Sequence, residues 1–117
     1  MDKIIGEAFN ELQNYLYKLT PAIEKTVQYF RGQKEDQGLN LLIPIIDGLH
    51  WVIEVVHAAK DWLIHYNIMM DENVMNENLR EMVSAMEHQD YVLLADVLEY
   101  ELLPVLQQLG KALEEVL

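Results

Sequence analysis

The fold is decided by residues 39–64, LNLLIPIIDGLHWVIEVVHAAKDWLI. On a helix of 3.6 residues per turn, this stretch is apolar around most of its circumference, so other elements must cover it on several sides. Its polar side chains fall on one narrow line: Asp47, His50, Glu54, His57, Asp61 and, one turn later, His65. We therefore expect the central helix of a packed bundle, with the polar line as either its window to solvent or a row of ligands.

The composition favours an all-α protein with a single domain over residues 1–117. Hydrophobic residues make up 51% of the chain. Leu, Glu, Ala, Met and Gln are common, whereas runs of Val, Ile and Thr with strand-like alternation are absent. A chain of this length can bury one modest core. The absence of cysteine excludes disulfides, thiolate zinc sites and a cysteine nucleophile.

A first long helix is expected before the central one, beginning after the N-cap residue Asp2 and ending at Gly32. Helical spacing persists through Pro21, which predicts either one kinked helix or a restart with Thr20 as the cap. The apolar residues that keep this spacing are Ile5, Phe9, Leu12, Leu16, Leu19, Ile23, Val27 and Phe30.

Glycines at both ends of residues 32–38, GQKEDQG, predict a loop between the first and central helices. The central helix is expected to end near Tyr66. Pro44 either kinks its start or marks its first turn. Asp71 then caps a third helix, which has a single apolar stripe.

Asp90 is expected to cap a fourth helix with a kink at Pro104. Its core face consists of Tyr91, Leu94, Leu98, Leu102, Val105, Leu109 and Leu113. A second apolar line follows another side of the same helix: Leu93, Val97, Tyr100 and Pro104. Short connections between the four helices predict an antiparallel up-down four-helix bundle with proline-kinked long helices.

The central and fourth helices carry more apolar surface than one small bundle can bury, and such a surplus usually marks a partner. For a small protein the commonest partner is a second copy, so we expect a homodimer. The candidate interface residues are Trp51, Trp62, Leu93, Val97, Tyr100 and Pro104. Tryptophan and tyrosine are enriched at interface hot spots, although ordinary core packing is the commoner role of large aromatic residues.

The formal charge of −12 restricts the possible partners. Residues 71–117 contain eleven acidic and two basic side chains, against nine and six in residues 1–70. Such a surface repels phosphate backbones and anionic membranes, so neither nucleic acid nor a membrane is an expected partner. A basic or amphipathic helix of another protein suits it better. The N-terminus does not follow the pattern of a signal peptide, so a cytoplasmic location is expected.

The closest approach to a metal site is formed by His50, Glu54 and His57, which share one helix face. Glu54 and His57 have the Glu-x-x-His spacing of di-metal carboxylate bundles. A complete site needs a second such pair, which this chain lacks. A symmetric dimer could supply it, with Glu99 or Glu101 as extra ligands. The alternative is a solvated helix face. No cofactor is therefore expected, with a divalent metal as the alternative.

Catalysis finds little support in the sequence. Only three serine and threonine residues are present, and there is no phosphate-binding loop or nucleophile elbow. Glu99 and Glu101 are two residues apart and point to different sides of a helix, which does not suit a carboxylate pair. Several methionines cluster around the third helix, where they either form an adaptable groove or fill the core.

Two segments resemble a family of small, acidic, all-helical bacterial proteins of unknown function. These segments are residues 42–56, LIPIIDGLHWVIEVV, and residues 76–106, NENLREMVSAMEHQDYVLLADVLEYELLPVL. The first contains the recurring pattern IP-x-I-x-x-G-x-x-W, and the second contains DYVLLADVLEYELLP. The resemblance implies a helical fold but no activity. A further likeness, in fold alone, is to flagellar export chaperones.

The expected function is that of a non-enzymatic interaction protein, an adaptor or chaperone that binds an amphipathic or basic segment by helix-in-groove contact. One alternative is a metal-binding bundle of carboxylates and histidines, with or without enzymatic activity. Another is a regulatory bundle that holds a small apolar ligand between its helices.

Overall fold

The first helix, α1 (Lys3–Arg31), begins and ends as its capping residues predict. Asp2 Oδ1 accepts hydrogen bonds from the amides of Ile4 and Ile5, at 2.9 and 3.3 Å. Gly32 follows the last turn. The computed structural model describes all of residues 1–117.

α1 is continuous through Pro21, so the alternative of a restart at this residue is wrong. Thr20 does not cap a new helix, because its hydroxyl donates to the carbonyl oxygen of Leu16 at 3.0 Å. The predicted apolar stripe is buried except at Ile5, which is half-buried; the buried residues are Phe9, Leu12, Leu16, Leu19, Ile23, Val27 and Phe30.

The second helix, α2 (Glu35–Ala58), starts earlier than the glycine pattern predicts, so most of the expected loop is helical. Two acidic residues, Glu35 and Asp36, occupy its first turn, where they complement the helix dipole. Gly38 is buried because the Phe30 ring packs against it; a Cβ there would lie 2.6 Å from the ring. This glycine serves close packing and does not form a turn.

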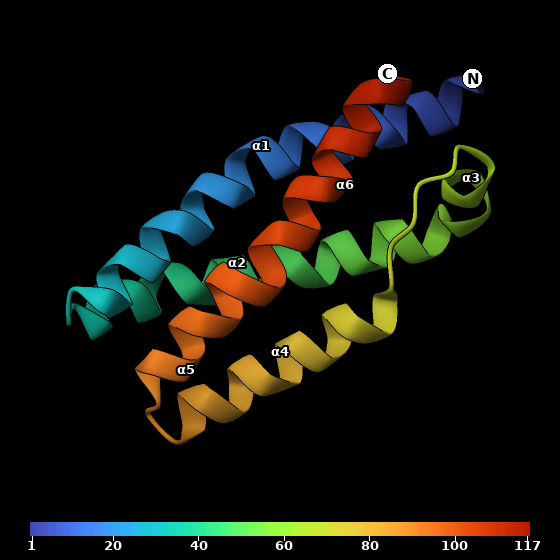
Figure 1. Cartoon of the computed structure of the whole chain (residues 1–117). Coiled ribbons are helices and arrows are strands. Elements are labelled where there is room, and N and C mark those ends of the chain that lie inside the picture. Colours follow the sequence, from blue (N-terminus) through green and yellow to red (C-terminus); the bar gives the residue numbers. More distant parts are fainter.

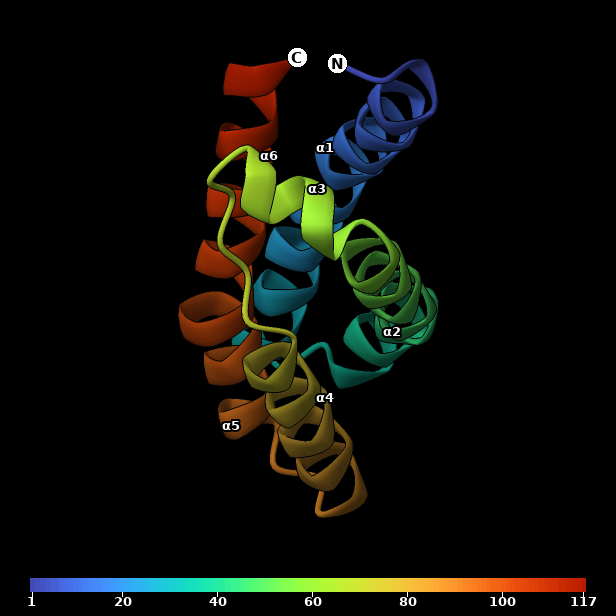
Figure 2. The same ribbon diagram turned by 90° about the vertical axis from the view of Figure 1, so that its right-hand side faces the viewer.

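Pro44 lies inside α2, so its placement in the first turn is wrong. The central helix also ends earlier than expected, because Ala59 leaves helical geometry with ψ at 12°. A separate short helix follows, α3 (Lys60–His65). It turns away from the axis of α2 (Figure 2), and Leu63 is buried in the core.

The caps predicted for the next two helices are confirmed. Asp71 Oδ1 accepts a hydrogen bond from the amide of Asn73 at 2.9 Å, at the start of α4 (Glu72–Glu87). Asp90 Oδ1 accepts one from the amide of Leu93 at 3.0 Å. It caps α5 (Tyr91–Asp96).

A π-helical segment, η1 (Val97–Leu102), joins α5 to the last helix, α6 (Leu103–Val116). Pro104 is the second residue of α6. A proline ring needs room beside the carbonyl one turn earlier, and the wider π turns supply it. The wider turns also change which residues face inward. Leu106 is fully buried where the sequence pattern favours Val105, which is only half-buried.

The predicted all-helical class is confirmed, and the long helices pack around one core. α1 packs against α2 on one side and against α5, η1 and α6 on the other, whereas α4 packs against α5, η1 and α2. The two termini lie at the same end (Figure 1). A single cluster of 28 buried hydrophobic residues connects these elements.

By length and composition alone, α2 could cross a membrane, a criterion that core helices of compact proteins also meet. Seven of its residues are buried in this fold: Gly38, Leu42, Ile45, Gly48, Leu49, Val52 and Val56. This packing is consistent with a soluble protein.

Candidate functional site

The candidate metal ligands His50, Glu54 and His57 are all exposed on α2. His57 Nδ1 lies 2.9 Å from Glu72 Oε2 on α4. His50 lines a cavity between α2 and α4 together with Arg80, whose positive charge disfavours a metal ion there. No group of three or more His, Asp and Glu side chains is placed to hold a metal ion. The three residues therefore do not converge within one chain.

The two tryptophans of the candidate interface have different environments. Trp51 is half-buried and packs edge-on against Tyr15 of α1, with ring centroids 5.1 Å apart. Trp62 is on α3, where its side chain is 38% exposed and lies edge-on to His65. Because the helix is interrupted between them, the two tryptophans do not share one helix face.

Val97 does not belong to an exposed surface, so this part of the prediction is wrong. Its side chain is fully buried. The sequence pattern assumes turns of 3.6 residues, whereas the wider π turns allow both Val97 and Leu98 to face the core. Leu93 is half-buried and packs against the core.

Tyr100 is 67% exposed and is the centre of a mixed surface. The guanidinium of Arg31 lies 5.6 Å from the centroid of its ring. The same guanidinium pairs with Asp96 at 2.9 Å and with Glu99 at 2.8 Å. The hydrogen bonds that the guanidinium donates to these two carboxylates raise the pKa of Arg31 above its ordinary value. They fix the arginine beside the tyrosine.

We call this region the η1 surface and define it by Val92, Asp96, Tyr100 and Pro104, which follow one another at intervals of four residues along α5, η1 and α6, with Arg31 beside them. Val92 is 70% exposed, and Pro104 is half-buried. The surface therefore combines apolar side chains with a charged cluster.

Glu101 does not join that cluster and lies instead beside Glu81 of α4. Burial raises the pKa of the Glu101 carboxyl, and the charge of Glu81 and a hydrogen bond to it raise the pKa further. The two acids thus form a like-charge contact between α4 and η1.

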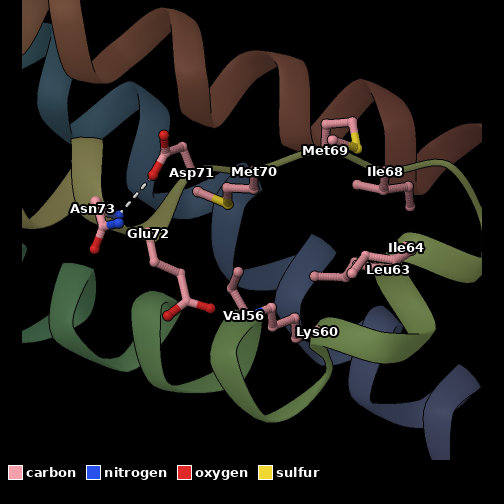
Figure 3. A pocket seen from close by; sticks show the side chains of 10 residues that line it. All are labelled: Val56, Lys60, Leu63, Ile64, Ile68, Met69, Met70, Asp71, Glu72 and Asn73. Atoms are coloured by element: carbon pink, nitrogen blue, oxygen red, sulfur yellow. Dashed lines mark hydrogen bonds between the residues drawn. The ribbon is translucent and has the colours of Figure 1, made fainter.

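Sequence reasoning missed a cavity of about 520 Å³ beneath the segment that joins α3 to α4. We call it the α3–α4 hollow; Figure 3 shows its lining side chains. Six of the lining residues are hydrophobic: Val56, Leu63, Ile64, Ile68, Met69 and Met70. The other four are polar: Lys60, Asp71, Glu72 and Asn73. The methionine cluster was the one sequence signal for this hollow, but the break at Ala59 that opens it had none.

Residues 7–112 match the family described as Domain of unknown function (DUF8042). The chain belongs to this family. The match includes both segments that carry the resemblance, residues 42–56 and 76–106, so membership of a family of unknown function is confirmed. No curated protein and no solved structure matches the chain.

Proposed function

We propose that this protein is a non-enzymatic interaction protein, an adaptor or chaperone of the cytoplasm that acts as a homodimer and binds basic or amphipathic segments. The observation that carries the proposal is the exposure of Val92 and Tyr100, at 70% and 67%, on the η1 surface outside a core that is already closed. Exposed apolar patches on small proteins mark contact surfaces. An up-down four-helix bundle with proline-kinked helices is the scaffold we propose for these surfaces.

The η1 surface has the features of a self-association site. Tyr100 is its exposed aromatic residue, and tyrosine and arginine are the residue types that dominate binding energy at interfaces. Arg31 is held beside the ring by two carboxylates, so little side-chain entropy remains to be lost on association. In a two-fold dimer the same surface of each copy would meet, with Val92 and Pro104 at its apolar edges.

Charge supports a basic partner for the rest of the surface. The net charge of −12 attracts basic segments and speeds their encounter with the protein. The same charge opposes contact with phosphate backbones.

Light scattering of the wild type and of Tyr100→Glu tests this proposal. The wild type is expected to have the mass of a dimer, and Tyr100→Glu the mass of a monomer with unchanged helicity in circular dichroism. Ile43→Glu is the matched control, because Ile43 is similarly exposed, at 61%, but lies on α2. A monomeric wild type, or a Tyr100→Glu variant that stays dimeric, contradicts the proposal. Val97→Glu is unsuitable, since it would bury a charge.

A further inference from the structure

We infer that the α3–α4 hollow is the docking site for a basic amphipathic helix of a partner protein, whose apolar side chains enter the hollow while its cations meet the acidic rim. The inference rests on the proposed function, because it names the surface and the partner chemistry for binding. It uses a part of the molecule separate from the η1 surface, so the two can be tested independently.

The apolar part of the hollow has a closed floor and an open rim. Val56 and Leu63 form the floor and are only 2% and 3% exposed. Ile64 of α3 and Met69 of the joining segment also line the hollow (Figure 3) and are 54% and 85% exposed. An apolar side chain in the hollow would remove water from both rim residues. Anchoring of this kind is how helix-in-groove complexes gain affinity.

The charges at the rim select a basic partner. Asp71 and Glu72 lie at one end of the hollow, and Lys60 is its only cation. Lys60 forms no ion pair with either acid. Asp71 caps α4 through Oδ1 alone, and Glu72 meets His57 through Oε2 alone, so each carboxylate retains one oxygen for a partner. A lysine or arginine is the side chain that such oxygens pair with.

An anionic ligand fits less well. A helix N-terminus commonly attracts anions through its free amides. At the start of α4, however, the amides of Asn73 and Val74 already donate to Asp71. A negatively charged headgroup would therefore meet two carboxylates and a single lysine.

The segment that joins α3 to α4 can adjust to different apolar side chains. Ile68 fixes one end, since its amide donates to the carbonyl oxygen of Leu63 at 2.8 Å. Met69 and Met70 lie outside any helix, and their amides donate no backbone hydrogen bond. Because methionine is unbranched and flexible, such a wall can repack around side chains of different shape.

Fluorescence anisotropy with a labelled leucine–lysine amphipathic peptide tests the inference on the full chain. The double variant Ile64→Gln/Met69→Gln removes the apolar rim without changing charge and is expected to weaken binding about tenfold. The control Ile43→Gln/Ile4→Gln makes the same exchange at two exposed residues outside both proposed surfaces and is expected to leave the affinity within about twofold. A leucine–glutamate peptide of the same pattern is expected not to bind.

Equal binding by the two double variants, or binding of the acidic peptide, overturns the inference. The inference is also overturned if an apolar dye binds the wild type and the basic peptide does not, because that result assigns the hollow to a small molecule. Light scattering on the same samples separates the two proposals. If the wild type is a dimer that does not bind the peptide, only the docking site is overturned. If it is a monomer that does not bind the peptide, the proposed function is overturned as well.

Discussion

The contact between α1 and α2 and the region between α3 and α4 show opposite ways of joining helices. Along the first contact, Gly48 lets Tyr15 approach so closely that a Cβ would lie 2.7 Å from its ring carbon Cζ. Trp51 then packs on the same tyrosine. Burial, and next the charge of Asp47, raise the pKa of the Tyr15 hydroxyl, as expected for a side chain between packed helices.

The region between α3 and α4 has no glycine and no long helix pair. α3 has six residues, and the segment after it is not helical. Its side chains leave a cavity of about 520 Å³, a size that encloses small ligands, for which the usual range is roughly 300–1,000 Å³. Gly48 and Trp51 of the IP-x-I-x-x-G-x-x-W pattern thus serve the packing of α1 against α2, whereas the α3–α4 hollow is the surface that we propose for binding.

The largest expected effect distinguishes the two regions by removing one buried leucine from each. Leu49→Ala, in fully buried packing on α2, is expected to cost near the upper end of the usual range of about 2–5 kcal/mol, because it leaves a closed cavity. Leu63→Ala is expected near the lower end, since it enlarges a hollow that is already open. Urea unfolding measures both. Equal losses would show that the hollow is as tightly packed as the core.

A smaller loss is expected from Gly48→Ala, about 1–3 kcal/mol, because the new methyl group overlaps the Tyr15 hydroxyl. Tyr15→Phe removes that oxygen. The double variant is therefore expected to lose less stability than the sum of the two single variants. If the two losses of stability in denaturant unfolding add strictly, the close approach of Gly48 and Tyr15 does not determine the stability of the contact between α1 and α2.

Much of this fold can be predicted from the sequence where the signal is local. Asp2, Asp71 and Asp90 cap helices as their spacing indicates. Gly38 shows the limit of such reasoning, because its role depends on Phe30, eight residues earlier and on another helix. Pattern alone assigns glycine to a turn, whereas tertiary contact assigns it to packing.

The candidate site was less predictable, since it depends on departures from regular helices. The π turns bury Val97, and the break at Ala59 opens the hollow next to Met69. A periodicity of 3.6 residues extends through both places without interruption. The line of acidic and histidine side chains on the central helix was visible in the sequence. Whether these side chains form a metal site depends on which side chains α4 brings to α2, and in this fold they form none.

A gain in stability is expected from Gly110→Ala on α6, the counterpart of Gly48→Ala. A Cβ at this position would meet Gln13 Oε1 at 3.5 Å and Leu16 Cδ1 at 3.9 Å, both ordinary contacts. Alanine then contributes its better helix propensity, about 0.5–1 kcal/mol. A rise in the denaturation midpoint confirms open space at this contact, and a fall would mean that α1 and α6 are packed as closely as α1 and α2.

The smallest effect on stability is expected from the contact between Glu101 of η1 and Glu81 of α4. Because the folded-state pKa of Glu101 is raised above its ordinary 4.5, the native state holds this proton more tightly than the unfolded state. The contribution of Glu101 to stability is therefore fully present below pH 4.5 and is lost as the pH rises through the raised value. Glu101→Gln is expected to stabilise the protein at pH 7 by a fraction of the roughly 1 kcal/mol typical of exposed charge pairs, since solvent screens both carboxylates.

This gain should disappear near pH 4, where the wild-type carboxyl is also neutral. Thermal unfolding of both proteins across this pH range measures it. Glu24→Gln, which removes an exposed carboxylate of α1, is the control and is expected to show no such pH-dependent gain. A gain that persists at pH 4 would locate the benefit in packing. The like-charge contact between Glu81 and Glu101 would then not lower the stability of the protein.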